Sequence, residues 1–109
     1  MNKDFRLFQT EFKKWQEKFG LNGYQVYFKY EPITECNADI TIHRQDMVAM
    51  CRLNKGENSR PSSLSAKHEA LHLLVNRLED LALNRYVRPE EIEEATEELV
   101  VKLESLIKG

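Results

Sequence analysis

The chain has few of the residues that crosslink or interrupt a fold: two cysteines, three prolines and four glycines among 109 residues. Cys36 and Cys51 stand far apart without a C-x-x-C spacing, which argues against a disulfide framework. They are typical of reduced thiols in a cytoplasmic protein, and a disulfide between them is the less favoured alternative. The chain also has no internal repeat and no low-complexity tract.

Long apolar runs and a strong net charge are missing too. No apolar stretch approaches the roughly 20 residues that span a bilayer. The start, MNKDFRLFQTEFKKW, has neither the apolar segment nor the cleavage site of a secretory signal. A formal net charge of -2 gives no reason to expect nucleic acid as the main partner. We therefore expect a cytoplasmic protein that neither crosses a membrane nor binds nucleic acid.

What is present predicts one globular domain over residues 1–109. Hydrophobic residues make up 41% of the chain and charged residues 31%, which is typical of a folded domain rather than a disordered chain. A chain of this length buries only a small core, so a bound metal would help to hold the fold.

Periodicity predicts a helix and then three strands in the first half of the chain. The helix is marked by an aromatic stripe at spacings of three and four, which should be core: Phe5, Phe8, Phe12, Trp15 and Phe19. Strand-like segments follow at 24–30, 38–43 and 47–53, and ADITIH at 38–43 alternates between apolar and polar residues. The short RQD at 44–46 predicts an antiparallel hairpin, and we expect an antiparallel meander.

Two helices are predicted in the second half, after a loop at 54–63 rich in Gly, Asn, Pro and Ser. The first runs from about 64 to about 80, and Ser62, Ser63 or Ser65 can cap its N-terminus. Its apolar face is formed by Leu64, Leu71, Leu74, Val75 and Leu78. The second begins at Pro89. Its apolar stripe is Ile92, Ala95, Thr96, Leu99, Leu103 and Leu106. The fold class is therefore α+β.

The stretch HEALH at 68–72 places two of the three histidines of the chain four residues apart on a predicted helix. Residues i and i+4 share a helix face, so the imidazoles of His68 and His72 can reach one ion at Zn–N distances of about 2.0–2.1 Å. Glu69 lies about 100° around the helix from His68, where it can contact a water on that ion. The spacing indicates two metal ligands and a general base. The alternative is an ordinary exposed helix surface.

A catalytic zinc site needs a third protein ligand, and the sequence offers several. His43 lies on the polar face of a predicted strand. The last helix carries Glu90, Glu91, Glu93, Glu94, Glu97 and Glu98. Most of these acids are expected to form a solvated face, favoured near a helix N-terminus by the helix dipole. Spacing alone leaves the choice open.

HEALH followed by EATEE in the last helix resembles the gluzincins, the thermolysin-like zinc peptidases, and above all their short form, the minigluzincins. HEALHLL followed by IEEA is also similar to small phage- and prophage-encoded metallopeptidases. The resemblance implies Zn²⁺ held by His68, His72 and Glu94, with Glu69 as general base and Glu98 supporting a ligating histidine. It also implies the order helix, three-stranded sheet, HExxH helix and glutamate helix.

One feature departs from the pattern of that family. The apolar stripe of the last helix is centred near Ile92, Leu99 and Leu103, and Glu94 points away from it. Glu91 and Glu93 lie nearer the edges of the stripe. The alternatives as third ligand are Glu91, Glu93, Glu98 and His43, or no third protein ligand at all.

The expected function is zinc-dependent hydrolysis of peptide bonds in a peptide or protein substrate. Glu69 would accept a proton from a metal-activated water, and a sheet edge would align the substrate. Tyr86 and His43 are candidate oxyanion donors, and nickel or cobalt could replace zinc. Two other functions stay open: a non-catalytic, metal-stabilised binding or regulatory module with the zincin fold, and a structural domain whose acidic last helix docks on a basic partner.

Overall fold

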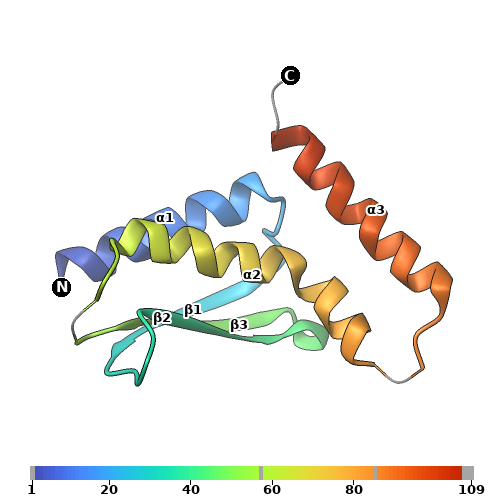
Figure 1. Cartoon of the computed structure of the whole chain (residues 1–109). Coiled ribbons are helices and arrows are strands. Elements are labelled where there is room, and N and C mark those ends of the chain that lie inside the picture. Colours follow the sequence, from blue (N-terminus) through green and yellow to red (C-terminus); the bar gives the residue numbers. More distant parts are fainter. Residues whose placement is uncertain (1, 57, 85, 107–109) are drawn as a thin grey trace.

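In the part of the chain that the structure describes, three helices and three strands follow one another in the order that the periodicity predicts. The computed structural model describes residues 2–56, 58–84 and 86–106, so part of the predicted loop at 54–63 and the residues after 106 lie outside the described ranges. The elements are α1 (Lys3–Lys18), β1 (Gln25–Glu31), β2 (Ala38–His43), a 3-10 turn (Arg44–Asp46), β3 (Val48–Asn54), α2 (Ser62–Leu83) and α3 (Pro89–Leu106). Figure 1 shows α1 and α2 on one face of the sheet and α3 standing away from it.

The predicted antiparallel meander is wrong, because the sheet is mixed and its order is β1-β3-β2. β2 pairs with β3 antiparallel, as the short RQD connection predicts, and Met47 closes that turn with φ 56° and an N–H bonded to the Arg44 carbonyl. β1 pairs with β3 in parallel, so β3 is the central strand and β1 and β2 are the edges.

Asn54, the last residue of β3, explains how the chain passes from β1 to β2 without pairing them. Its side-chain amide donates to the carbonyls of Ile33 and Cys36, at 3.0 and 2.9 Å. Its Oδ1 accepts from the N–H groups of Ile33 and Gly56, at 3.1 and 2.9 Å. These bonds hold the β1–β2 connection at the end of β3, the strand that lies between the two others.

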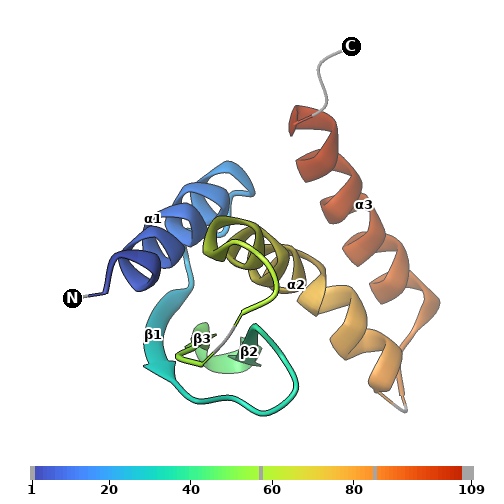
Figure 2. The ribbon, with the colours of Figure 1, turned by 60° about the vertical axis from the view of Figure 1, so that its left-hand side comes forward.

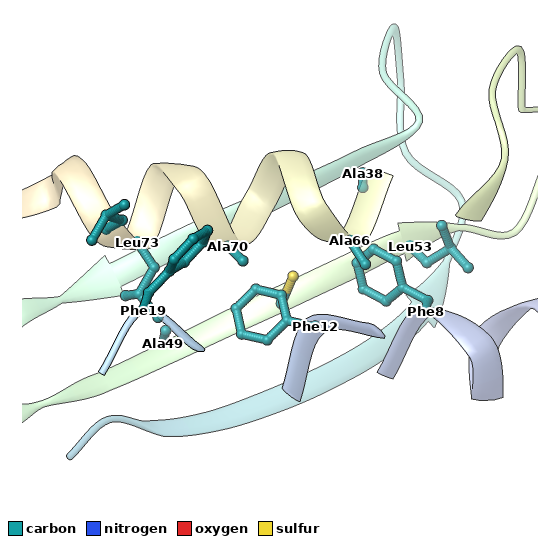
Figure 3. Close-up of a cluster of buried hydrophobic side chains, with 11 residues drawn as sticks. Phe8, Phe12, Phe19, Ala38, Ala49, Leu53, Ala66, Ala70 and Leu73 are labelled. Carbon is teal, nitrogen blue, oxygen red and sulfur yellow. The ribbon is translucent and has the colours of Figure 1, made fainter. Parts of the chain in front are cut away.

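The core lies between the inner face of the sheet and the helices α1 and α2, as Figure 3 shows. The aromatic stripe of α1 is confirmed, since Phe8 and Phe12 are fully buried and Phe19 is 3% exposed. Phe8 and Phe12 both pack edge-on against the ring of Phe28 in β1. The sheet contributes a row of small and branched residues to the core: Ala38, Ile40, Ile42, Ala49, Cys51 and Leu53.

Helix α2 starts earlier and ends later than predicted, and it buries a different face. Its first turn follows Pro61 at the N-cap position, and no serine side chain caps it. Leu64 and Leu71, which were expected to be core, are 44% and 38% exposed. Leu74 is buried as predicted, and the other buried residues lie outside the predicted apolar set: Ser65, Ala66, Glu69, Ala70 and Leu73. The small alanine side chains allow α2 to approach the sheet closely. Glu69 lies on the same buried face as Ala66 and Ala70 and therefore points inward.

Helix α3 begins at Pro89, as predicted, but only part of its apolar stripe is covered. Ala95 is 4% exposed, and Leu99 and Leu106 pack against the core, whereas Ile92 and Leu103 are 42% and 38% exposed. Figure 2 shows that α3 diverges from α2 and does not lie on the sheet.

Candidate metal centre

His68 and His72 lie on the exposed side of α2, and their ring nitrogens face each other. The two Nε2 atoms are 3.2 Å apart, with the rings arranged edge to face at a centroid distance of 4.8 Å. Two nitrogens that bind one tetrahedral zinc at about 2.05 Å stand about 3.3 Å apart. The same separation suits a hydrogen bond between two neutral imidazoles. The pair thus has the nitrogen separation that one shared ion requires.

The electrostatic surroundings favour the neutral, metal-binding form of His68. Its pKa lies below the ordinary value, chiefly because of partial desolvation and then because of repulsion from His72 and Arg60. Imidazole binds a metal only when its ligating nitrogen is unprotonated. A lowered pKa therefore extends metal binding toward lower pH.

Glu69 is the buried member of the motif, with only 5% of its surface exposed. Its pKa is raised to about 7, chiefly by burial and then by the Asp39 carboxylate, while Arg60 partly opposes the shift. Among the described residues, no group donates a hydrogen bond to its carboxylate. A carboxyl group that titrates near neutral pH is suited to both accepting and returning a proton.

A shallow hollow joins the motif to the edge strand β2. Its wall on α2 includes His68, Glu69 and His72, and its wall on β2 includes Ile40 and Ile42. Because β2 is an outer strand of the sheet, one of its edges has no strand partner within the described residues. The two histidines and the buried carboxylate therefore open toward a strand edge that could pair with an extended peptide.

The structure does not bring Glu94 to the histidine pair. Glu94 Oε1 lies 2.8 Å from Nη2 of Arg77 on α2, and Glu98 contacts Nη1 of the same guanidinium. Arg77 follows His72 by five residues, which places it about 140° around the helix axis. Glu94 and Glu98 are therefore held on another side of α2 from the imidazoles.

The other candidate ligands and oxyanion donors also lie elsewhere. Glu91 bonds the N–H of Arg88 and pairs with its guanidinium at 3.6 Å. Glu93 lines a hollow formed by α3 alone. His43 faces a separate hollow beside the 3-10 turn, and Tyr86 is 83% exposed in the α2–α3 turn.

The donor set fits a metal in part. His68 and His72 supply two nitrogens at the right separation, but within the described ranges no three His, Cys, Asp or Glu side chains gather closely enough to hold an ion. The third ligand is the part of the predicted site that this arrangement leaves unassembled.

Two acids of the hollow were missed by the sequence reasoning. Glu79 follows His68 by eleven residues, so helix periodicity puts it about 20° from His68 and could have found it. Asp39, on β2, could not be placed there without the sheet order. Glu79 and Asp39 line the hollow together with Cys36 at its rim. Cys36 and Cys51 are both free thiols, as expected, the first exposed and the second buried.

Comparison of the chain with family models, curated proteins and solved structures finds no match. Within the described residues, no helix has the length and apolar character needed to cross a membrane.

Proposed function

We propose that this chain is a zinc-dependent peptidase of the minigluzincin type, in which His68 and His72 hold the metal and Glu69 is the general base. The observation that supports it most is the 3.2 Å separation of the two Nε2 atoms, one turn apart on a helix that also buries the neighbouring glutamate. When bound, zinc would supply a Lewis acid and a water whose pKa is lowered to about 7.

The residues of the chain would divide the work between them. Glu69 would accept a proton from the attacking water and return it to the leaving amine, since its own pKa of about 7 suits both transfers. The free edge of β2 would pair with the backbone of an extended peptide or protein substrate and carry its scissile bond across the hollow. Glu94 is the proposed third ligand, and it would have to leave Arg77 to serve.

A second candidate function is a non-catalytic, metal-stabilised binding or regulatory module. It is favoured by the position of Glu94, which is bound to Arg77 and so leaves two protein ligands at the motif. A pair of imidazoles can bind a divalent ion and stabilise a small domain without activating water for hydrolysis.

The two functions differ in what Glu69→Gln does. For a peptidase, zinc-loaded protein incubated with a peptide mixture gives cleavage products by mass spectrometry, and Glu69→Gln abolishes them while zinc stays bound. Glu79→Gln is the matched control, because it makes the same change in the same hollow and should keep cleavage. Products that persist unchanged in Glu69→Gln would refute the assigned base. Stoichiometric zinc without any cleavage would favour the binding module.

The metal ligands have their own test. His68→Ala and His72→Ala should each lose zinc, measured after dialysis by elemental analysis. His43→Ala should keep it, because His43 faces a different hollow.

A further inference from the structure

Arg77 joins the two helices that carry the proposed metal ligands. Its guanidinium spans Glu94 and Glu98, which stand four residues apart on one face of α3. The side chain of Arg77 is 23% exposed, whereas those of Glu94 and Glu98 are 72% and 48% exposed. One largely covered arginine therefore holds two acids of the last helix.

Arg77 holds Glu94 on a different side of α2 from the two histidines. Because it is about 140° around the axis from His72, the contacts with Glu94 draw the acidic face of α3 away from the imidazole pair. Glu94 is also the carboxylate that the family resemblance assigns to the metal. Arg77 and the proposed metal site thus compete for the same side chain.

Apolar packing and a hydrogen bond to Gly20 also hold α3. Ala95, Leu99 and Leu106 pack toward the core, while Val101 is 55% exposed. Lys102 donates one hydrogen bond to the carbonyl of Gly20, at 3.2 Å. Ion pairs between exposed side chains contribute little stability each, so exchanging the Glu94 pair for a metal bond would cost little.

We infer that Arg77 is a latch that holds Glu94 away from His68 and His72, and that zinc binding with a full ligand set requires Glu94 to leave it. This inference rests on the proposed metal site. The contacts made by Arg77 reduce the fraction of molecules in which Glu94 is free to bind zinc, and the apparent zinc affinity falls in proportion to that fraction. Arg77 is a positioning residue, because it touches neither the imidazoles nor the hollow between α2 and β2.

Zinc affinity, measured by competition with a chromophoric chelator on the full chain, tests the latch. Arg77→Met should bind zinc roughly threefold to tenfold more tightly than the unchanged protein, as expected for the loss of two partly exposed ion pairs. In the double variant Arg77→Met with Glu94→Gln, the gain should disappear. Arg88→Met is the matched control: it removes an arginine paired with another α3 glutamate and should leave the affinity unchanged.

A second readout follows the position of α3 without relying on affinity. Spin labels on Thr10→Cys in α1 and Val101→Cys in α3, in a Cys36→Ser background, report the distance between these helices. Zinc should shift that distance in the latched protein, and Arg77→Met should shift or broaden it before zinc is added. If Arg77→Met fails to fold, Arg77→Lys, which contacts one carboxylate at a time, should give a smaller gain in affinity.

The outcomes separate the latch from the site on which it rests. If zinc binds in a His68-dependent manner but Arg77→Met binds it no more tightly, and α3 keeps its distance, the latch is overturned and the proposed function stands. A gain that survives Glu94→Gln also overturns it, because the effect is then one of charge alone. If no variant shows His68-dependent zinc binding, both proposals fail.

Discussion

Replacing Glu69 by glutamine should make the metal-free protein more stable at high pH. The substitution keeps the shape of a side chain that is 5% exposed and removes its charge. Burial, aided by Asp39 and opposed by Arg60, raises the pKa of Glu69 to about 7, from an ordinary value of 4.5. Ionisation of a buried carboxyl group destabilises the folded protein, and functional sites often carry such a cost.

The size and sign of the effect follow from these two pKa values. Below pH 4.5 the Glu69 carboxyl is protonated in both the folded and the unfolded chain, so it costs nothing. As the pH rises from 4.5 to 7, the unfolded chain ionises first and the folded protein loses stability, up to about 3 kcal/mol. Water in the open hollow reduces this figure, so we expect about 1–3 kcal/mol at pH 8.

Urea unfolding in the presence of EDTA, at pH 4, 6 and 8, measures this difference. The free energies of unfolding of Glu69→Gln and of the unchanged protein should agree at pH 4 and diverge steadily toward pH 8. Glu79→Gln removes an exposed glutamate of the same helix and should show no such trend. Parallel curves for Glu69→Gln and the unchanged protein at all three pH values would refute the burial argument.

Three further substitutions test the fold that positions the site, each by urea unfolding. Asn54→Ala should lower the free energy of unfolding by about 2–4 kcal/mol, because it removes four hydrogen bonds at the β1–β2 connection. A loss below about 1 kcal/mol would mean that the connection keeps its conformation without these bonds. Phe12→Ala should cost about 3–5 kcal/mol, since the ring is fully buried, and a smaller loss would place the core elsewhere. Gln16→Ala should cost about 1–3 kcal/mol, because its amide bonds the carbonyls of Leu21 and Tyr24; an unchanged midpoint would contradict that role.

Local patterns predicted the elements but not the arrangement of the strands. The spacing of Phe8, Phe12 and Phe19 reports which face of a helix is apolar, and the alternation in ADITIH reports which face of β2 turns inward. Neither pattern says which strand lies next to which. The connection between β1 and β2 is held by Asn54, whose side chain bonds backbone groups 18 and 21 residues away, and no periodicity reveals such contacts.

The candidate site divides in the same way. The His68–His72 pair lies within one helix, so its spacing predicted that the two imidazoles share a helix face. The third ligand depends on how α3 packs against α2, which is set by Arg77 and by the few apolar residues of α3 that reach the core. The sequence reasoning weighed the acids of the last helix but not the basic residue on α2 that pairs with them.

The central claim is that the imidazoles of His68 and His72 share one divalent ion. An anomalous-difference map at the zinc edge, from crystals grown with stoichiometric zinc, tests it most directly. We predict a single peak within about 2.0–2.1 Å of both Nε2 atoms. A map with no peak between these two nitrogens, or with the zinc bound at other residues, would contradict the claim.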